Sequence, residues 1–199
     1  MTVPGVRRLR LFFALWPSDD QRATLVGLTG PAIAPVAGKP VQPANLHVTL
    51  AFLGSVPGGG FPDLVAVGGQ AGHPAVELAF QRLEYWPKPR VVVAMPARVP
   101  PAGRQIVNRL WTGLESLGYE REHRPWQPHL TLVRHVRQAP PPSFGPTLPA
   151  MVANGAAAGW QLALVESSTH PEGVRYRPLA TWPLKGRLKG TQPFSDSSD

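Results

Sequence analysis

The pattern of apolar and polar positions along the chain alternates between a repeat typical of strands and one typical of helices. Four short runs are continuously apolar or rich in β-branched residues, which predicts largely buried strands. These runs are residues 10–17, 47–54, 90–96 and 129–133. Between about residues 102 and 118, apolar residues recur at helical spacing and predict an amphipathic helix. Its expected core-facing residues are Ile106, Val107, Leu110, Trp111, Leu114 and Leu117.

The order of these segments predicts an internal repeat. Ser18 and Gln21 form a capping-box pattern, so a helix is expected to follow the first strand and to end near Gly30. The second pair of strands encloses a helix in the same order. We therefore predict two β-α-β halves of nearly equal length, beginning near residues 10 and 90 and related by a pseudo-twofold axis.

The remaining segments complete an α+β fold. A helix is expected at residues 61–72, although glycines weaken the pattern. Further strands are expected at residues 75–86, 158–168 and 174–184. We predict two pseudo-twofold-related lobes whose mostly antiparallel sheets line a central cleft, with helices outside. Residues 1–188 are expected to form this single bilobal domain, and the Gly-, Ser- and Asp-rich residues 189–199 a flexible tail.

Composition narrows the possible chemistry and location. The chain of 199 residues contains no cysteine, which excludes disulfides, zinc–thiolate sites, iron–sulfur clusters and a cysteine nucleophile. No apolar stretch approaches the roughly 20 residues that a membrane helix needs. The short apolar run near the N-terminus lacks a signal-peptide cleavage site. We expect a soluble, cytoplasmic protein that does not bind membranes.

The charge balance favours a polyanionic partner. The sequence contains 20 Lys and Arg against 12 Asp and Glu, a formal net charge of +8, and the arginines are spread along the chain. Such a surface attracts nucleic acid through long-range electrostatics. Solubility alone is the alternative explanation.

Two His-x-Thr motifs occupy matching places in the predicted repeat. His47 and Thr49 begin one predicted strand, and His129 and Thr131 begin another. Because successive side chains of a strand point to opposite faces, each histidine faces the same way as its threonine. If the halves are related by a pseudo-twofold axis, two imidazoles and two hydroxyls converge in one cleft.

These side chains fit acid–base cleavage of a phosphate ester. In-line displacement needs a base for the attacking oxygen and an acid for the leaving oxygen, and imidazole titrates near neutral pH. The threonine hydroxyls can donate hydrogen bonds to nonbridging phosphate oxygens. A two-histidine metal site is the competing interpretation, but neither motif has a carboxylate or cysteine at short spacing. Acyl transfer is less well supported, since the chain has no Gly-x-Ser-x-Gly.

Both motifs resemble the signatures of a known enzyme family. Asn45 to Gly54 and Arg124 to Arg134 resemble the two signatures of the two-histidine (2H) phosphoesterases, in particular the bacterial RNA 2′,3′-cyclic phosphodiesterases, also called 2′-5′ RNA ligases. Segments near both ends of the chain extend the resemblance over about residues 9–185. The resemblance implies that a 2′,3′-cyclic phosphate on RNA is hydrolysed to a 2′-phosphate without metal or other cofactor.

The resemblance also implies roles for individual residues. His47 would donate a proton to the leaving 3′ oxygen, and His129 would accept one from water. Thr49 and Thr131 would bind the phosphate oxygens. Arg134 would clamp the phosphate if the strand ends or bulges before it, because strict alternation places it opposite His129; otherwise its role is structural. Phe13 is a candidate for stacking on a base, with a core position as the alternative.

Two other functions compete with hydrolysis as the main role. One is ATP-independent 2′-5′ RNA ligation, the reverse reaction in the same site. The other is a non-catalytic module that binds RNA ends. The expected partner in each case is RNA, ending in a 2′,3′-cyclic phosphate for the enzyme, with tRNA fragments as one candidate source, and the protein is expected to be a monomer.

Overall fold

Two antiparallel sheets form the centre of the fold in the computed structural model, which describes residues 8–141, 144, 147–152 and 159–185. The first sheet has the spatial order β3 (Val48–Pro57), β1 (Arg8–Pro17), β8 (Trp160–His170) and β9 (Gly173–Pro183). The second sheet has the order β2 (Lys39–Pro40), β6 (Leu130–Arg134), β5 (Val91–Pro96), β4 (Ala79–Trp86) and β7 (Thr147–Val152). The predicted α+β class with mostly antiparallel sheets is confirmed.

The internal repeat is visible in the strand order. In the first sheet β1 lies between β3 and β8, and in the second sheet β5 lies between β6 and β4. Helix α1 (Asp19–Ile33) follows β1, and helix α3 (Pro101–Ser116) follows β5. Each half therefore contains a strand, a helix and an antiparallel neighbour of the first strand, as the sequence predicted.

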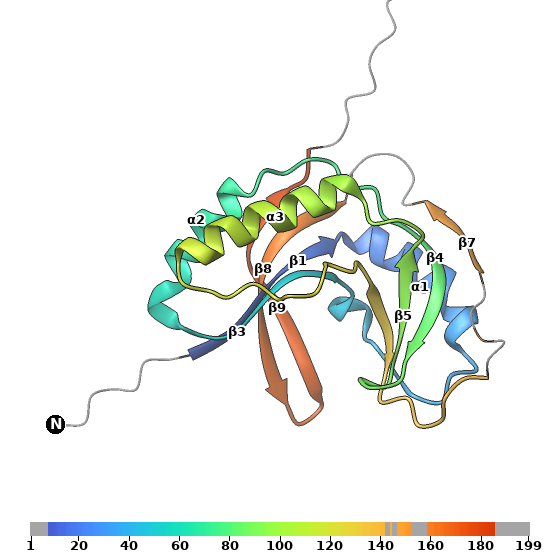
Figure 1. Ribbon diagram of the computed structural model, residues 1–199. Coiled ribbons are helices and arrows are strands. Elements are labelled where there is room, and N and C mark those ends of the chain that lie inside the picture. The colour runs from blue at the N-terminus through green and yellow to red at the C-terminus, as the bar shows by residue number, and fades with distance from the viewer. Residues whose placement is uncertain (1–7, 142–143, 145–146, 153–158, 186–199) are drawn as a thin grey trace, which may run out of the picture.

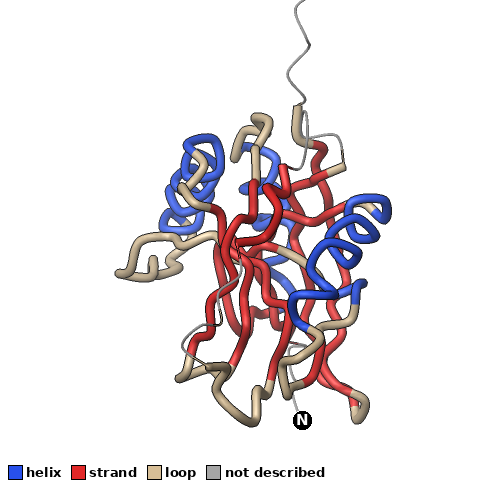
Figure 2. The backbone as a smooth tube through the Cα atoms, turned by 90° about the vertical axis from the view of Figure 1, so that its right-hand side faces the viewer, coloured by secondary structure: helices blue, strands red, loops and turns tan. Residues whose placement is uncertain are grey.

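The helices join the halves into one body. Helix α1 contacts β6 and β7 of the second sheet as well as β1, whereas α3 contacts β3 of the first sheet. Helix α2 (Phe61–Gln70) contacts α3 and β8, and α2 and α3 lie together over the first sheet (Figure 1). The strands occupy the middle of the molecule with helices on both sides (Figure 2). Short 3-10 helices span Pro43–Asn45 and Gly58–Gly60.

Strand β1 is buried on both faces, and this divides its side chains between two clusters. Leu11, Phe13 and Leu15 are fully buried in the main core, which extends across both sheets and the helices. Phe12 and Trp16 lie in a smaller cluster with residues of β8 and with Tyr176. The alternation follows from the period of two along a strand.

The predicted core face of α3 is largely confirmed. Its buried residues include Ile106, Val107, Leu110, Trp111 and Leu114. Leu117 was expected in this stripe, but its side chain is 41% exposed. The reason is that the helix ends at Ser116, so that Leu117 is the C-cap residue and leaves the helical repeat.

Other elements differ from the sequence predictions in their bounds. Helix α1 continues through Pro31 to Ile33, where the backbone N–H of Ala34 bonds to the carbonyl of Gly30 (3.0 Å). The glycine-rich helix at 61–70 forms, and Gly68 leaves room for the ring of Trp182. Strands β2 and β7 were not predicted. The predicted tail, residues 189–199, lies outside the described residues.

None of the helices within the described ranges is long and apolar enough to cross a bilayer.

Candidate active site

His47 lies immediately before β3, and its ring is fixed by the backbone and by aromatic neighbours. Its Nδ1 lies 2.7 Å from the carbonyl oxygen of Asn45. The ring centroid is 4.9 Å from Phe12, 4.9 Å from Tyr176 and 5.9 Å from Trp16. A carbonyl oxygen only accepts, so Nδ1 carries a proton and Nε2 is the nitrogen available for proton transfer.

His129 repeats this arrangement immediately before β6. Its Nδ1 lies 2.8 Å from the carbonyl oxygen of Gln127, again two residues earlier in the chain. Trp86 packs against the ring with centroids 4.6 Å apart. Both histidines therefore hold the same tautomer when neutral, with an Nε2 lone pair that accepts a proton, and become Nε2–H donors when protonated.

The environment lowers the pKa of both histidines. The pKa of His47 is lowered from 6.5 to about 4, mainly by burial and also by the charges of Arg134 and His129, while the hydrogen bond to Asn45 partly opposes the shift. Burial also lowers the pKa of His129, opposed by the bond to Gln127 and assisted by Arg134 and Arg124. Both imidazoles are thus neutral at pH 7 when no anion is bound.

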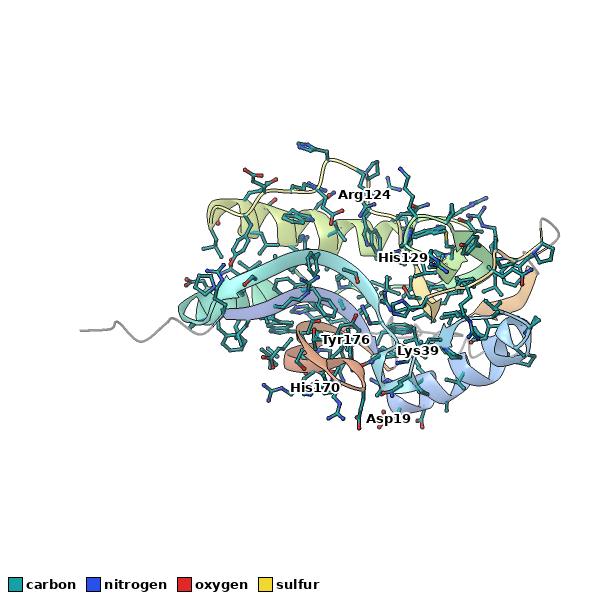
Figure 3. The ribbon with its side chains drawn as sticks, turned by 90° about the horizontal axis from the view of Figure 1, so that it is seen from below. Asp19, Lys39, Arg124, His129, His170 and Tyr176 are labelled. Carbon is teal, nitrogen blue, oxygen red and sulfur yellow. The ribbon has the colours of Figure 1, made fainter. Side chains whose placement is uncertain are left out.

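Two adjoining cavities open on the histidines. The His47 pocket, of about 410 Å³, is lined by His47, Thr49, Phe52, Arg134, Tyr176 and neighbouring residues of β1 and β8. The His129 pocket, of about 150 Å³, is lined by His129, Thr49, Phe52, Trp86, Arg124, Trp126 and the adjacent loop. Thr49 and Phe52 belong to both walls, so the pockets are two parts of one cleft. Figure 3 labels Tyr176 on the β8–β9 hairpin and His129 and Arg124 on the segment leading into β6.

A β-bulge brings Arg134 to this cleft. Val93 of β5 pairs with Thr131 of β6, but the next residue along, Val92, pairs with Val133. Leu132 therefore has no partner residue on β5 and is the extra residue of a bulge. A bulge reverses the alternation of side chains beyond it. Arg134 therefore shares the face of Thr131, lines the His47 pocket and lies close enough to both histidines to lower their pKa. Of the two alternatives left by the sequence, the bulge is the one observed.

Comparison with known proteins supports the resemblance seen in the motifs. The family described as LigT-like phosphoesterase matches residues 15–93. The RNA 2′,3′-cyclic phosphodiesterase of Escherichia coli is 34% identical over 179 residues, covering 88% of this chain and 96% of that protein. The protein of the same name from Thermus thermophilus is 33% identical over 193 residues, covering 89% and 91%. The chain belongs to the LigT-like phosphoesterase family.

Solved structures of LigT-like phosphoesterases share the fold. The apo crystal structure of Escherichia coli LigT superposes with a TM-score of 0.70 at 28% identity, covering 89% of this chain and 98% of that chain. A crystal structure from Thermus thermophilus gives a TM-score of 0.71 at 30% identity, covering 90% and 100%. The fold of these structures is thus present over most of the chain.

Of the two alternatives for Phe13, the core position is the one observed. Its ring is fully buried in the main core of this LigT-like phosphoesterase, near Trp182 with centroids 6.4 Å apart. The adjacent Phe12 points to the opposite face of β1 and lines the His47 pocket. Strand alternation made one of the two rings face the cleft, but the sequence did not show which.

The two threonines are placed differently. Thr49 lies in the wall shared by both pockets. Thr131 is partly buried on β6, and it is not among the residues that line either pocket. Its role in binding phosphate therefore stays a prediction.

Several residues of the cleft were not predicted from the sequence. Tyr176 and Trp86 come from segments outside the two His-x-Thr signatures, and only the fold brings them to the histidines, whereas Trp126 lies within the second signature, three residues before His129. The sequence identified Asn45 only as part of the first signature and predicted no separate role for it. Its side-chain Nδ2 donates to the carbonyl of Val174 (2.9 Å), and its Oδ1 accepts from the backbone N–H of Tyr176 (3.2 Å).

Within the part of the chain that the structure describes, no three His, Asp or Glu side chains gather in a way that could hold a metal ion. The charged side chains that lower the pKa of these histidines include two arginines, Arg134 for both and Arg124 for His129. Such a lining attracts an anion rather than a cation.

Proposed function

We propose that this LigT-like phosphoesterase hydrolyses 2′,3′-cyclic phosphate ends of RNA to 2′-phosphomonoesters by acid–base catalysis between His47 and His129. The observation that carries the proposal is the pair of equivalent hydrogen bonds from each Nδ1 to the carbonyl two residues earlier. These bonds leave two Nε2 atoms, one in each half, to act on one substrate.

The reaction follows from in-line displacement at phosphorus. Nε2 of His129 takes a proton from water as its oxygen attacks the cyclic phosphate. The bond from phosphorus to the 3′ oxygen breaks on the opposite side, and Nε2–H of His47 gives that oxygen its proton. The phosphate stays on the 2′ oxygen. One proton enters the pair and one leaves it, so the pair keeps a single proton over the cycle, although its position is reversed.

The phosphate is held by groups that carry or donate positive charge. The bulge brings Arg134 to the cleft, which supports a role in pairing with the nonbridging oxygens, and the position of Thr49 in the walls of both pockets supports a role beside the phosphorus. Thr131 is proposed as a second hydroxyl donor. These donors face the charge that the transition state places on the nonbridging oxygens.

Substrate binding supplies the protonation state that the free site lacks. In the empty cleft His47 is neutral at pH 7 because its pKa is about 4. A bound phosphodiester brings a negative charge next to the ring and compensates the charge of Arg134, which raises the pKa of His47. The proton donor is therefore formed preferentially in the complex with substrate.

RNA is the proposed substrate because the relatives from Escherichia coli and Thermus thermophilus are named RNA 2′,3′-cyclic phosphodiesterases and because the net charge of +8 favours a polyanion. Fragments of tRNA are one candidate source of such ends. Both histidines come from one chain, so we propose that a monomer is active. A cytoplasmic location stays a prediction.

The test uses an oligoribonucleotide with a 2′,3′-cyclic end in the presence of excess EDTA. We expect full turnover to the 2′-phosphate, identified by phosphorus NMR, and loss of activity by a factor of at least about 10² in His47→Ala and in His129→Ala. His123→Ala, at an exposed histidine outside the motifs, is the matched control. Inhibition by EDTA, a 3′-phosphate product, or an active His129→Ala protein would contradict the mechanism.

The same experiment separates the enzyme from a module that only binds RNA ends. Binding without turnover between pH 5 and 8 would favour the module, because an acid–base pair predicts a bell-shaped dependence of rate on pH.

A further inference from the structure

A third cavity opens beside the His47 pocket, between the β2 edge of the second sheet and the β8–β9 hairpin of the first. This cavity, called the Lys39 pocket below, has a volume of about 140 Å³, and its lining includes Lys39, Arg134, His135, Glu172 and Tyr176. Arg134 and Tyr176 also line the His47 pocket, so the two cavities share a wall. Lys39 and Tyr176 lie near each other in Figure 3.

The short strand β2 places two cations side by side in this wall. Lys39 pairs with Arg134 in the register of β2 and β6. Residues directly opposite each other on antiparallel strands present their side chains on the same face, within contact range. Gly38 permits the close approach, because a Cβ there would lie 2.5 Å from Val133 and 3.0 Å from the carbonyl oxygen of Arg134. The strand therefore seats Lys39 next to Arg134.

This pairing of like charges is unfavourable unless an anion joins it. Like charges directly opposite on paired strands repel and destabilise the sheet. The Lys39 ammonium makes one long contact, 3.4 Å, with the carbonyl oxygen of Glu172, and the carboxylate of Glu172 is paired with Arg175 (2.6 Å). An ammonium has three N–H donors and a guanidinium five, so donors remain for a phosphate that would bridge the two cations.

His135 adds a third donor through an unusual backbone conformation. Its φ is +52°, in the left-handed region that residues other than glycine rarely adopt. Such strain is concentrated at ligand-binding sites, where the surrounding structure maintains it. The exposed imidazole lines the Lys39 pocket directly after Arg134. One of its ring nitrogens can donate to a phosphate oxygen whether the ring is neutral or protonated.

The roles of the two histidines determine which phosphate would reach this pocket. In the proposed reaction His47 protonates the leaving 3′ oxygen, so the ribose of the terminal nucleotide lies on the His47 side of the phosphorus. The 5′ carbon of the same ribose carries the next phosphodiester of the RNA. That phosphodiester therefore leaves the active site through the His47 pocket, and the Lys39 pocket adjoins it with a cationic lining.

We propose that Lys39, Arg134 and His135 form a second phosphate subsite, which binds the phosphodiester on the 5′ side of the terminal nucleotide. This inference rests on the proposed function, because the roles of His47 and His129 orient the substrate. Arg134 then lies between the two phosphates and contacts both. The subsite favours the end of an RNA chain over a nucleoside cyclic phosphate that has no 5′ phosphate.

Binding of two product analogues tests the subsite without turnover. Adenosine 2′-phosphate and adenosine 2′,5′-bisphosphate differ only by the phosphate that the subsite would take. We expect the wild type to bind the bisphosphate about 3- to 10-fold more tightly, and this ratio to decrease at high salt. Lys39→Gln should lower the ratio toward one. His135→Gly should also lower it, and glycine keeps the fold because it adopts positive φ without strain.

The matched control is Lys185→Gln, at an exposed lysine outside the lining of the Lys39 pocket, which should leave the ratio unchanged. Equal affinity of the wild type for the two analogues, or an unchanged ratio in Lys39→Gln, overturns the proposal. So does loss of the ratio only in Arg10→Gln, because Arg10 lines the His47 pocket but not the Lys39 pocket.

Kinetics then separates the subsite from the proposed function. The substrates are adenosine 2′,3′-cyclic phosphate with and without a 5′-phosphate, and the reactive cyclic end fixes their orientation. Lys39→Gln should raise the KM of the first relative to that of the second. If the binding ratio depends on Lys39 but neither substrate is hydrolysed, the proposed function fails while the subsite stands. Turnover of both substrates with equal KM in the wild type overturns the subsite alone.

Discussion

The indole N–H of Trp126 donates a hydrogen bond to the backbone carbonyl of Thr49 (2.9 Å), joining two residues 77 positions apart. Thr49 lies on an edge strand, so one side of its backbone has no neighbouring strand among the described residues. Trp126 stands three residues before His129, and Gly103 of α3 makes room for its ring. This bond therefore connects the segment that carries one motif histidine to the strand that follows the other.

The variant Trp126→Phe should separate the effect of this hydrogen bond from the effect of side-chain packing. Phenylalanine keeps most of the apolar contacts but cannot donate to Thr49, so we expect a loss of roughly 0.5–1.5 kcal/mol of unfolding free energy. We also expect kcat to fall, because the distance between the two Nε2 atoms is less well fixed. Urea unfolding and steady-state kinetics measure both effects.

The control is Trp160→Phe, which makes the same change at a buried tryptophan whose indole N–H has no partner among the described residues. It should leave kcat unchanged. If Trp126→Phe retains full kcat, the bond has no role in positioning the site.

Arg134 provides a second prediction because its charge acts on both histidines. Arg134→Gln removes a charge that lowers the pKa of His47 and of His129, so both pKa values should rise. The affinity for phosphate should fall at the same time. NMR titration of the two imidazoles follows the first effect, and phosphate titration the second.

Arg134→Lys is the matched variant for this prediction. It retains the charge but loses the paired hydrogen bonds, so the histidine pKa values should stay near those of the wild type while phosphate still binds more weakly. Unchanged pKa values in Arg134→Gln would show that the bulge does not direct the guanidinium to the site.

Asn45 is predicted to position the proton donor through Tyr176. Its side-chain amide bonds to the backbone of Val174 and of Tyr176, and its own carbonyl accepts the bond from His47. Asn45→Ala keeps that carbonyl but releases the β8–β9 hairpin. Water then reaches the His47 ring more easily, and the pKa of His47 should rise from about 4 toward its ordinary value.

Histidine NMR and the dependence of kcat on pH measure this effect. The control is Gln127→Ala, since Gln127 supplies the equivalent carbonyl to His129. It should leave the pKa of His47 unchanged. A pKa of His47 in Asn45→Ala that stays as low as in the wild type would show that Tyr176 remains in place without the amide.

The sequence predicted the elements and the histidine pair, but not the register that completes the site. Apolar periodicity and the repeated motif are local patterns, and they sufficed to predict α3, the four strands of the repeat and the position of His47 and His129 on one cleft. The side on which Phe52 and Arg134 lie depends on bulges, which arise from the pairing of strands distant in the chain. Tyr176 reaches His47 only through a hairpin more than a hundred residues away along the sequence.

The dependence of kcat/KM on pH gives a fourth prediction. This ratio reports the free enzyme, whose reactive form has one proton shared between two histidines of lowered pKa. The optimum lies between the two apparent pKa values, so it should fall below 6.5. Because bound phosphate raises both pKa values, the optimum of kcat should lie at higher pH. Coincident optima would show that the substrate does not alter the protonation of the pair.

The partly buried imidazole of His47 also makes folding stability depend on pH. Its pKa is about 4 in the folded chain, against 6.5 for an ordinary histidine, so the unfolded chain binds more protons between these values. The contribution of His47 to the free energy of unfolding should therefore be fully present above about pH 7. It should decrease by on the order of 3 kcal/mol as the pH falls toward about 4. His47→Gln removes this contribution, so urea unfolding at several pH values should give a smaller decrease for the variant. Above about pH 7 the two curves should run parallel, because both side chains are then uncharged in the folded and the unfolded chain. Curves that stay parallel throughout the acid range would instead show that the His47 ring is protonated freely in the native fold, and would remove the reason to expect substrate-induced protonation of the donor.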